Sequence, residues 1–258
     1  MTTLVHDLGW SAVRWIEDLG KLAVFSLKAV RAGLTPPWRL RAFIDEVFKL
    51  GVLSLVIICV SGLAVGMVLG LQGYNTLVRF GAEQSLGAVV GLSLIRELGP
   101  VLTALLATGR AGSATTAEIG TMVATEQLDA LRMMSVDPID LVVTPRAAAM
   151  AFVMPLLSAL FIVCGLFGGY LVGVALMGID AGAYMTSLEG AVDFRDDVCG
   201  SVLKAGVFGV LAGLISTYRG YSAEPTSAGV GAATTSTVVF TSVSVLIVDY
   251  VITALWGV

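Results

Sequence analysis

Five long stretches of apolar residues, each nearly free of charge, dominate the pattern along this chain. Roughly 20 apolar residues are enough for a helix to cross a bilayer. We therefore predict membrane-spanning helices at about 50–73, 86–110, 147–175, 198–217 and 233–256. This pattern predicts an all-α polytopic membrane protein with five transmembrane helices.

Glycines mark one face of the first predicted span. Gly62, Gly66 and Gly70 recur every four residues, which places them on one side of a helix. Small residues at this spacing allow two membrane helices to approach closely. We expect this face to be a contact between helices.

The chain before the first span differs, because charged side chains recur through residues 1–49. Over 4–31 the polar residues recur every three or four positions, which is typical of an amphipathic interfacial helix. A helix packed on another subunit would show the same spacing. Prolines at 36 and 37 should end this helix. We divide the chain into interfacial helices, 1–49, and a five-span domain, 50–258, and expect no cleaved signal peptide.

Two shorter helices are predicted between the spans. The first, at about 118–137, is too polar to cross a membrane, and its apolar residues alternate with charged ones at helical spacing. Asp137-Pro138 should end it. Such a helix fits a groove on an ATPase, although an ordinary connecting helix resting on lipid headgroups would have the same pattern. The second, 181–191, is predicted on the opposite side of the membrane.

Lys and Arg residues indicate the orientation in the membrane. Seven precede the first span, three lie between the second and third, and one follows the fourth, all on the same side. The other side has Arg79 and Arg195, together with an acidic loop between the third and fourth spans. Cytoplasmic loops are enriched in Lys and Arg. We therefore predict a cytoplasmic N-terminus and an external C-terminus.

Composition supports a membrane protein and limits its chemistry. Hydrophobic residues make up 57% of the chain and charged residues 13%, whereas soluble domains carry about 25% charged residues. Lys and Arg are too sparse for a nucleic-acid-binding surface. The single His and three dispersed Cys indicate neither a metal site nor a disulfide framework. The sequence has no P-loop motif, so we expect no enzyme activity or cofactor, and any ATP would be hydrolysed by another subunit.

Four charged residues fall inside the predicted spans: Arg96, Glu97, Lys204 and Asp249. Charges in a bilayer are costly, so they should pair or face a polar cavity. Their distances from the external ends of the spans place them at similar depth in the outer half of the membrane. We predict one polar layer, with Lys204 paired to Asp249 and Arg96 paired to Glu97 or a neighbour. The layer either fixes helix register or lines a substrate cavity.

Three groups of motifs, in this order, resemble the MlaE permease family, the membrane subunits of ABC systems that work with MCE proteins. They are RELGPV at 96–101 with GRAG at 109–112, EIGTM at 118–122 with EQLDAL at 126–131 and Asp137-Pro138, and GVG at 229–231 with ATT at 233–235. Each motif alone is unspecific, but their order and spacing are specific. The resemblance covers essentially the whole chain.

The resemblance implies a homodimeric, multi-pass permease in the inner membrane of a Gram-negative bacterium. Its partners would be an ABC ATPase subunit, which binds the ATP, a periplasmic MCE-domain protein and a STAS-domain protein. The substrate would be a phospholipid moved between the inner and outer membranes, which maintains the lipid asymmetry of the outer membrane. The segment at 118–138 would be the coupling helix that receives the motion of the ATPase.

The pattern and the resemblance together give two sets of candidate residues. The lipid cavity would open outward at the dimer interface, with Leu69, Tyr74, Leu77, Val78, Arg96 and Glu97 along it. Arg96 suits the phosphate because guanidinium matches its geometry, or Glu97 neutralises it and it never touches lipid. The ATPase contact would be made by Glu118, Glu126, Leu128, Asp129, Leu131, Arg132 and Met134.

Three alternatives to a phospholipid permease stay open. The substrate could be another hydrophobic molecule, such as a sterol. The chain could be an ion-coupled secondary transporter, with the polar layer relaying protons, although the odd number of spans and the absence of an inverted repeat argue against this. It could also be a scaffold that only anchors an MCE protein.

Overall fold

The computed structural model describes residues 17–18, 20–33 and 39–256, and this part of the chain is helical, without β-strands. Five helical segments are long and apolar enough to cross a membrane: Leu40–Phe80, Glu83–Ala124, Ile139–Leu176, Phe194–Tyr221 and Ser227–Leu255. Each contains one predicted span, apart from the last residue of the fifth. The all-α polytopic fold is therefore confirmed. We refer to these segments as spans 1 to 5.

Most spans consist of more than one helical element. Span 1 contains α2 (Leu40–Gly51), η1 (Val52–Ser54), α3 (Leu55–Leu77) and η2 (Val78–Phe80); span 2 contains η3 (Glu83–Ser85), α4 (Leu86–Ser93), η4 (Leu94–Leu98), α5 (Gly99–Ala107), η5 (Thr108–Gly112) and α6 (Ser113–Ala124). Span 3 contains η6 (Ile139–Val143), α8 (Thr144–Tyr170) and η7 (Leu171–Leu176), span 4 contains η8 (Phe194–Val198) and α10 (Cys199–Tyr221), and span 5 is α11 (Ser227–Trp256). Span 1 crosses the predicted domain boundary at residue 49 without a break in the helical segment.

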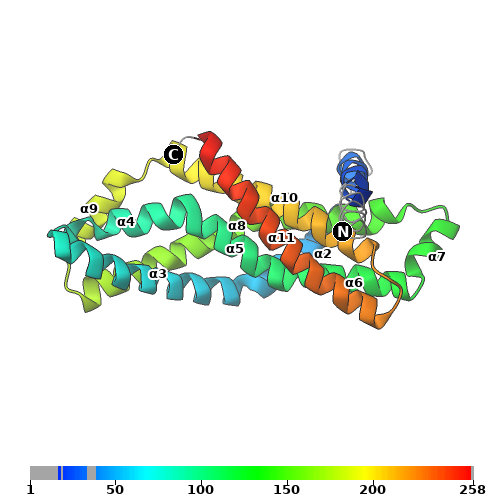
Figure 1. The fold of residues 1–258 in the computed structure, drawn as a ribbon, viewed down its shortest axis with the longest axis horizontal. Coiled ribbons are helices and arrows are strands. Elements are labelled where there is room, and N and C mark those ends of the chain that lie inside the picture. The colour runs from blue at the N-terminus through cyan, green and yellow to red at the C-terminus, as the bar shows by residue number, and fades with distance from the viewer. Residues whose placement is uncertain (1–16, 19, 34–38, 257–258) are drawn as a thin grey trace, which may run out of the picture.

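The spans run along the long axis of the molecule, with α7 (Gln127–Met133) at one end and α9 (Ala181–Ala191) at the other (Figure 1). α8 packs against α2, α3, α5 and α10. α11 crosses obliquely over the bundle and packs against α5, α6 and α10 (Figure 1). We refer below to the α7 end and the α9 end.

The predicted glycine face of span 1 is a close contact with α8. A Cβ atom added at Gly66 would lie 1.9 Å from the carbonyl oxygen of Gly165, and one added at Gly62 would lie 2.6 Å from the oxygen of Phe161. Gly70 meets Gly169 in the same way, at 3.2 Å. The two backbones approach so closely that a methyl group does not fit at Gly62 or Gly66. The prediction of a small-residue contact is confirmed.

The predicted single helix at 118–137 is wrong. Span 2 continues as α6 to Ala124, well beyond the predicted end at 110, and α7 starts only at Gln127. Glu126 separates the two helices with a left-handed backbone, φ 59°. Neither glycine nor proline marks this break, and these are the residues that usually signal one. Ser135 is also left-handed, φ 60°, and lies just after α7.

The predicted external helix at 181–191 is present as α9. The Asp180 side chain caps its start by accepting a hydrogen bond from the Ala183 N–H at 2.8 Å, which satisfies a backbone donor that the helix leaves free. Tyr184 is fully buried against the ends of spans 2 and 3. Burial raises the pKa of Tyr184 to about 12.

The N-terminal helix predicted at 4–31 lies partly outside the described residues. Residues 20–33 are helical and stand across the long axis near the α7 end (Figure 1). Phe25 is buried there, and its ring centroid lies 5.4 Å from that of Tyr218. On the same helix Val24, Leu27 and Val30 are exposed. This part of the helix is therefore anchored on the bundle through one face and leaves apolar residues uncovered.

Candidate functional site

Arg96 and Glu97 lie on η4, a single π-helical turn between α4 and α5. Such turns interrupt α-helices and are frequent at functional sites. Pro100 follows closely and has no N–H, so the Arg96 carbonyl lacks its usual α-helical donor four residues on. Lys204 Nζ on α10 donates to this carbonyl at 3.0 Å. The irregular backbone of span 2 thus supplies an acceptor to a charge on span 4.

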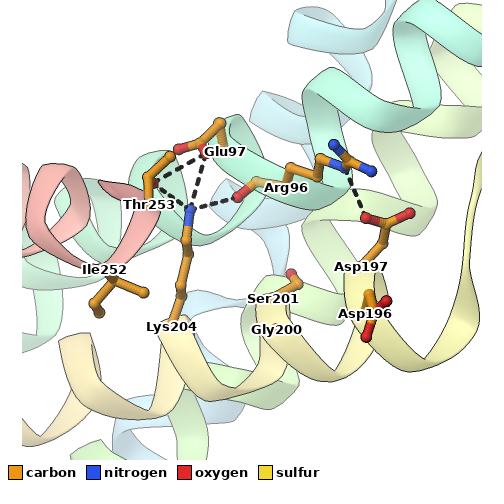
Figure 2. Close-up of a pocket in the computed structure, with 9 residues that line it drawn as sticks. All are labelled: Arg96, Glu97, Asp196, Asp197, Gly200, Ser201, Lys204, Ile252 and Thr253. Carbon is orange, nitrogen blue, oxygen red and sulfur yellow. Dashed lines mark hydrogen bonds and ion pairs between the residues drawn. The ribbon is translucent and has the colours of Figure 1, made fainter. Parts of the chain in front are cut away.

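Lys204 is the centre of a cluster that joins three spans, and we call Glu97, Lys204, Asp249 and Thr253 the Lys204 cluster. Its ammonium group donates to Glu97 Oε1 at 2.9 Å and to Thr253 Oγ1 at 2.8 Å (Figure 2). Asp249 Oδ1 lies 3.5 Å from Lys204 Nζ. Only 7% of Lys204 is exposed. A buried ammonium group requires such partners, because it has lost its hydration.

Arg96 points away from this cluster, toward Asp197 (Figure 2). Its Nε donates to Asp197 Oδ1 on η8 at 2.6 Å. Asp197 is buried and also accepts from the Asp193 N–H at 2.8 Å. Arg96 was predicted to pair with Glu97 or a neighbour; in the structure it pairs with Asp197, which was not named as a partner, and Glu97 pairs with Lys204. The predicted polar layer is therefore an Arg96–Asp197 ion pair next to the Lys204 cluster, in which Lys204 pairs with both Glu97 and Asp249.

The hollow between these charges is small. Its lining includes Arg96, Glu97, Asp197, Ser201, Lys204 and Thr253, and its volume is about 30 Å³. A hollow needs about 10–15 Å³ to hold one water molecule, so this one has room for about two. A phospholipid headgroup does not fit there. In this conformation the polar layer holds helices together and does not form an open binding cavity.

A larger hollow lies between α3 and α4, in the half of the molecule near α9. Its volume is about 380 Å³, and it is lined by Leu69, Gln72, Gly73, Thr76, Leu77, Val89, Val90 and Ser93. Small-molecule pockets have volumes in this range, and they are typically lined by apolar residues with a few polar ones. Leu69 and Leu77 were predicted lipid contacts. The amide and hydroxyl groups of Gln72, Thr76 and Ser93 were missed, because single polar residues in a span carry no distinctive sequence signal.

The six predicted lipid contacts therefore fall in different places. Leu69 and Leu77 line the α3–α4 hollow, and Arg96 and Glu97 line the small hollow at Lys204. Tyr74 is half-buried and packs on the core. Val78 is 45% exposed. Neither Tyr74 nor Val78 lines either hollow.

The α7 segment presents exposed residues that are held by a buried anchor. Leu128 is buried against Ile119 and Val142, so it fixes α7 to the bundle, and Leu131 is half-buried. The exposed members of the predicted ATPase contact are Glu118, Glu126, Asp129, Arg132 and Met134. Met133 is 83% exposed and was missed. Apolar side chains this exposed outside the spans are typical of an interaction site.

Two residues of the predicted contact, Arg132 and Glu118, also have partners within the chain. Arg132 donates to Asp129 Oδ1 at 2.7 Å and also to the Tyr221 hydroxyl at the end of span 4. Glu118 lies on α6 and accepts from Arg146 Nη2 at 3.1 Å. Arg146 itself was not singled out by the sequence analysis. Among the described residues, no cluster of His, Cys, Asp and Glu could hold a metal ion.

The model of the family Permease MlaE matches residues 43–255, which include all the candidate residues above. The chain belongs to the MlaE permease family. The intermembrane phospholipid transport system permease protein of Haemophilus influenzae is 47% identical to it over 254 residues, which cover 94% of this chain and 97% of the relative.

More distant relatives of this MlaE-family permease include a bacterial protein and a chloroplast protein. A probable ABC transporter permease of Rickettsia bellii is 41% identical over 256 residues, which cover 99% of this chain and 98% of the relative. The chloroplastic protein TRIGALACTOSYLDIACYLGLYCEROL 1 of Arabidopsis thaliana is 34% identical over 245 residues, covering 95% of this chain and 70% of that protein. The relationship therefore extends over nearly the whole chain.

Proposed function

We propose that this chain is the membrane permease subunit of an ABC system that moves phospholipids between two membranes. The observation that carries the proposal is the full-length relationship to the Haemophilus influenzae phospholipid permease. Two features of the structure support it. The α3–α4 hollow is large enough for part of an acyl chain, and the exposed α7 segment at the opposite end suits a motor subunit. The sequence itself has no P-loop.

The orientation and partners belong to the same proposal. The α7 end lies in the cytoplasm with the N-terminus, and the α9 end faces the periplasm of a Gram-negative cell, as the Lys and Arg distribution indicates. An ABC ATPase, and a STAS-domain protein, bind on the α7 side. A periplasmic MCE-domain protein exchanges lipid on the α9 side, and the system maintains outer-membrane asymmetry.

A homodimer is supported by the exposure of span 5. Only 11% of the most apolar 18-residue stretch of span 5 is buried within the described chain. Val243, Leu246, Ile247 and Tyr250 are all exposed on it. Helices of a bundle normally bury one stripe against a neighbour. A second copy packed near span 5 would cover this helix and enclose the α3–α4 hollow.

The motion would pass from α7 to the lipid site along span 2. ATP binding closes the ATPase subunits and pushes on α7, which Leu128 holds rigidly to the bundle. α6 and α5 connect this point to η4 in one helical segment. Lys204 joins η4 to spans 4 and 5, so these helices move together. The wall of the α3–α4 hollow then shifts, and the lipid leaves or enters at the α9 end.

The lipid site can be tested by photo-crosslinking after purification in detergent, when bulk lipid has been removed. A photoreactive residue at Thr76, in the α3–α4 hollow, is expected to form an adduct with a phospholipid, detected by mass spectrometry. The matched control is Val163, which is 62% exposed on the outside of span 3. Equal yields of the phospholipid adduct at Thr76 and Val163 would contradict a lipid site in the α3–α4 hollow. A sterol-like adduct at Thr76 would identify a different hydrophobic substrate.

A further inference from the structure

A buried arginine connects three helical segments at the α7 end. Arg146 on α8 is 8% exposed, and its Nη2 donates to Glu118 Oε2 on α6 at 3.1 Å. Its Nε lies 3.5 Å from Glu46 Oε1 on α2. Its Nη1 donates to the Val142 carbonyl at 3.1 Å. Glu46 is also buried, at 8% exposure. One guanidinium thus holds the start of span 1 and the end of span 2 against span 3.

A second arginine joins span 2 to the same part of span 1. Arg110 lies on η5, and its Nη1 donates to the Lys49 carbonyl at 3.2 Å and to Ser54 Oγ at 2.9 Å. Ser54 is fully buried, and its hydroxyl donates to the Leu50 carbonyl at 2.6 Å. These groups surround η1, the short 3₁₀ stretch where α2 changes into α3. Short 3₁₀ stretches inside a helix often mark hinges.

We propose that Arg110 and Arg146 form a clamp that carries the motion of α6 and α7 into span 1 at the η1 hinge. The proposal rests on the proposed function. The buried guanidinium of Arg146 resists separation from Glu46 and Glu118, because it would be left without a carboxylate in a buried position. Displacement of α6 therefore pulls α2 with it. α3 begins directly after the hinge and ends beside the α3–α4 hollow. The two arginines position this helix and do not touch the lipid.

The clamp makes span 1 a second route of coupling. If the motion passed along span 2 alone, displacement of α6 would move only α4, which forms one wall of the α3–α4 hollow. Through the clamp, the same displacement also moves α3, which forms the other wall and carries Leu69, Gln72 and Thr76. The α3–α4 hollow then opens and closes because α3 and α4 move relative to each other, and displacement of α6 drives both.

The test is the number of phospholipids transferred per ATP hydrolysed by the purified complex. Glu46→Gln removes one carboxylate from Arg146 and lies away from the exposed α7 surface. We expect transfer per ATP to fall about fivefold, because mutations along a coupling network change coupling by this order. The ATP hydrolysis rate should stay close to that of the wild-type complex. The matched control is Asp45→Asn, a neighbouring exposed carboxylate on α2, which should leave both rates unchanged.

A purely structural role gives a different result. In that case the melting temperature or the yield would fall while transfer per ATP of the folded complex stays at the wild-type value, and this outcome would overturn the clamp. If Glu46→Gln does not assemble, Ser54→Ala removes a partner of Arg110 more mildly and should lower the same ratio. If the wild-type complex shows no ATP-driven transfer, the proposed function fails. If the wild-type complex transfers lipid, and Glu46→Gln and Ser54→Ala both keep the wild-type transfer per ATP, the clamp proposal fails and the proposed function stands.

Discussion

Replacement of Lys204 by methionine should strongly destabilise the folded permease. Lys204 is 7% exposed and is the only cation of the Lys204 cluster, in which Glu97 and Asp249 are the carboxylates. The variant leaves both carboxylates without a cation inside a membrane span. Breaking a buried ion pair by removing one partner costs about 3–5 kcal/mol. The measurement is the thermal unfolding of the detergent-purified protein.

The matched control and the second-site variant separate charge from size. Lys28→Met changes an exposed lysine and should alter stability by less than about 0.5 kcal/mol. Adding Glu97→Gln to Lys204→Met removes the closest carboxylate and should restore much of the stability. If the double variant is as unstable as Lys204→Met alone, the ion-pair explanation is wrong.

Transport by the same double variant distinguishes the two roles left open for the polar layer. The hollow at Lys204 holds about 30 Å³, too little for a headgroup. We therefore expect transport to recover together with the fold. A stable double variant without transport would mean that the charges act on the substrate.

Replacement of Gly66 by alanine should disrupt the contact between spans 1 and 3. The added methyl carbon would lie 1.9 Å from the Gly165 carbonyl oxygen, and backbone atoms cannot move aside as a side chain can. Overpacking typically costs about 1–3 kcal/mol, and a clash with backbone lies at the upper end or beyond. The melting temperature and the yield of monodisperse protein measure the effect.

A glycine with open surroundings provides the comparison. Gly206 lies in span 4, where an added Cβ would meet only Pro155 Cγ, at 3.9 Å. Gly206→Ala should be close to neutral, since this is ordinary van der Waals distance. Equal melting temperatures for Gly66→Ala and Gly206→Ala would contradict the close approach of α3 and α8.

Features that have strong local signals in the sequence could be predicted. Apolar runs located the five spans, and the glycine repeat predicted a close contact between helices, although only the structure shows that α8 is the partner. The four intramembrane charges stood out since such residues are rare there. Their similar depth brought Lys204 and Asp249 together, and Lys204 Nζ lies 3.5 Å from Asp249 Oδ1. The α9 helix was predicted at 181–191 within the acidic loop, and the structure adds that Asp180 caps its start.

Features that depend on tertiary contacts were missed. Arg96 pairs with Asp197, which the sequence placed only in an acidic loop. The break at Glu126 lacks a glycine or proline, so α6 and α7 appeared as one helix. Arg146 and Glu46 lie at the edges of predicted spans, where charged residues are common, and only the packing of three segments buries them. The α3–α4 hollow likewise exists only between helices.

The most direct measurement is ATP-dependent transfer of labelled phospholipid by the complex purified with its own ATPase and reconstituted in vesicles. If this chain is an ATP-driven phospholipid permease, transfer requires ATP. Transfer should fall about tenfold or more in Met133→Ser/Met134→Ser, because the variant removes central apolar contacts with the ATPase. Both methionines are exposed at the α7 end. Met185→Ser, at the α9 end, should not weaken ATPase binding. Transfer driven by an ion gradient without ATP, or untouched by the α7 variant, would contradict the account.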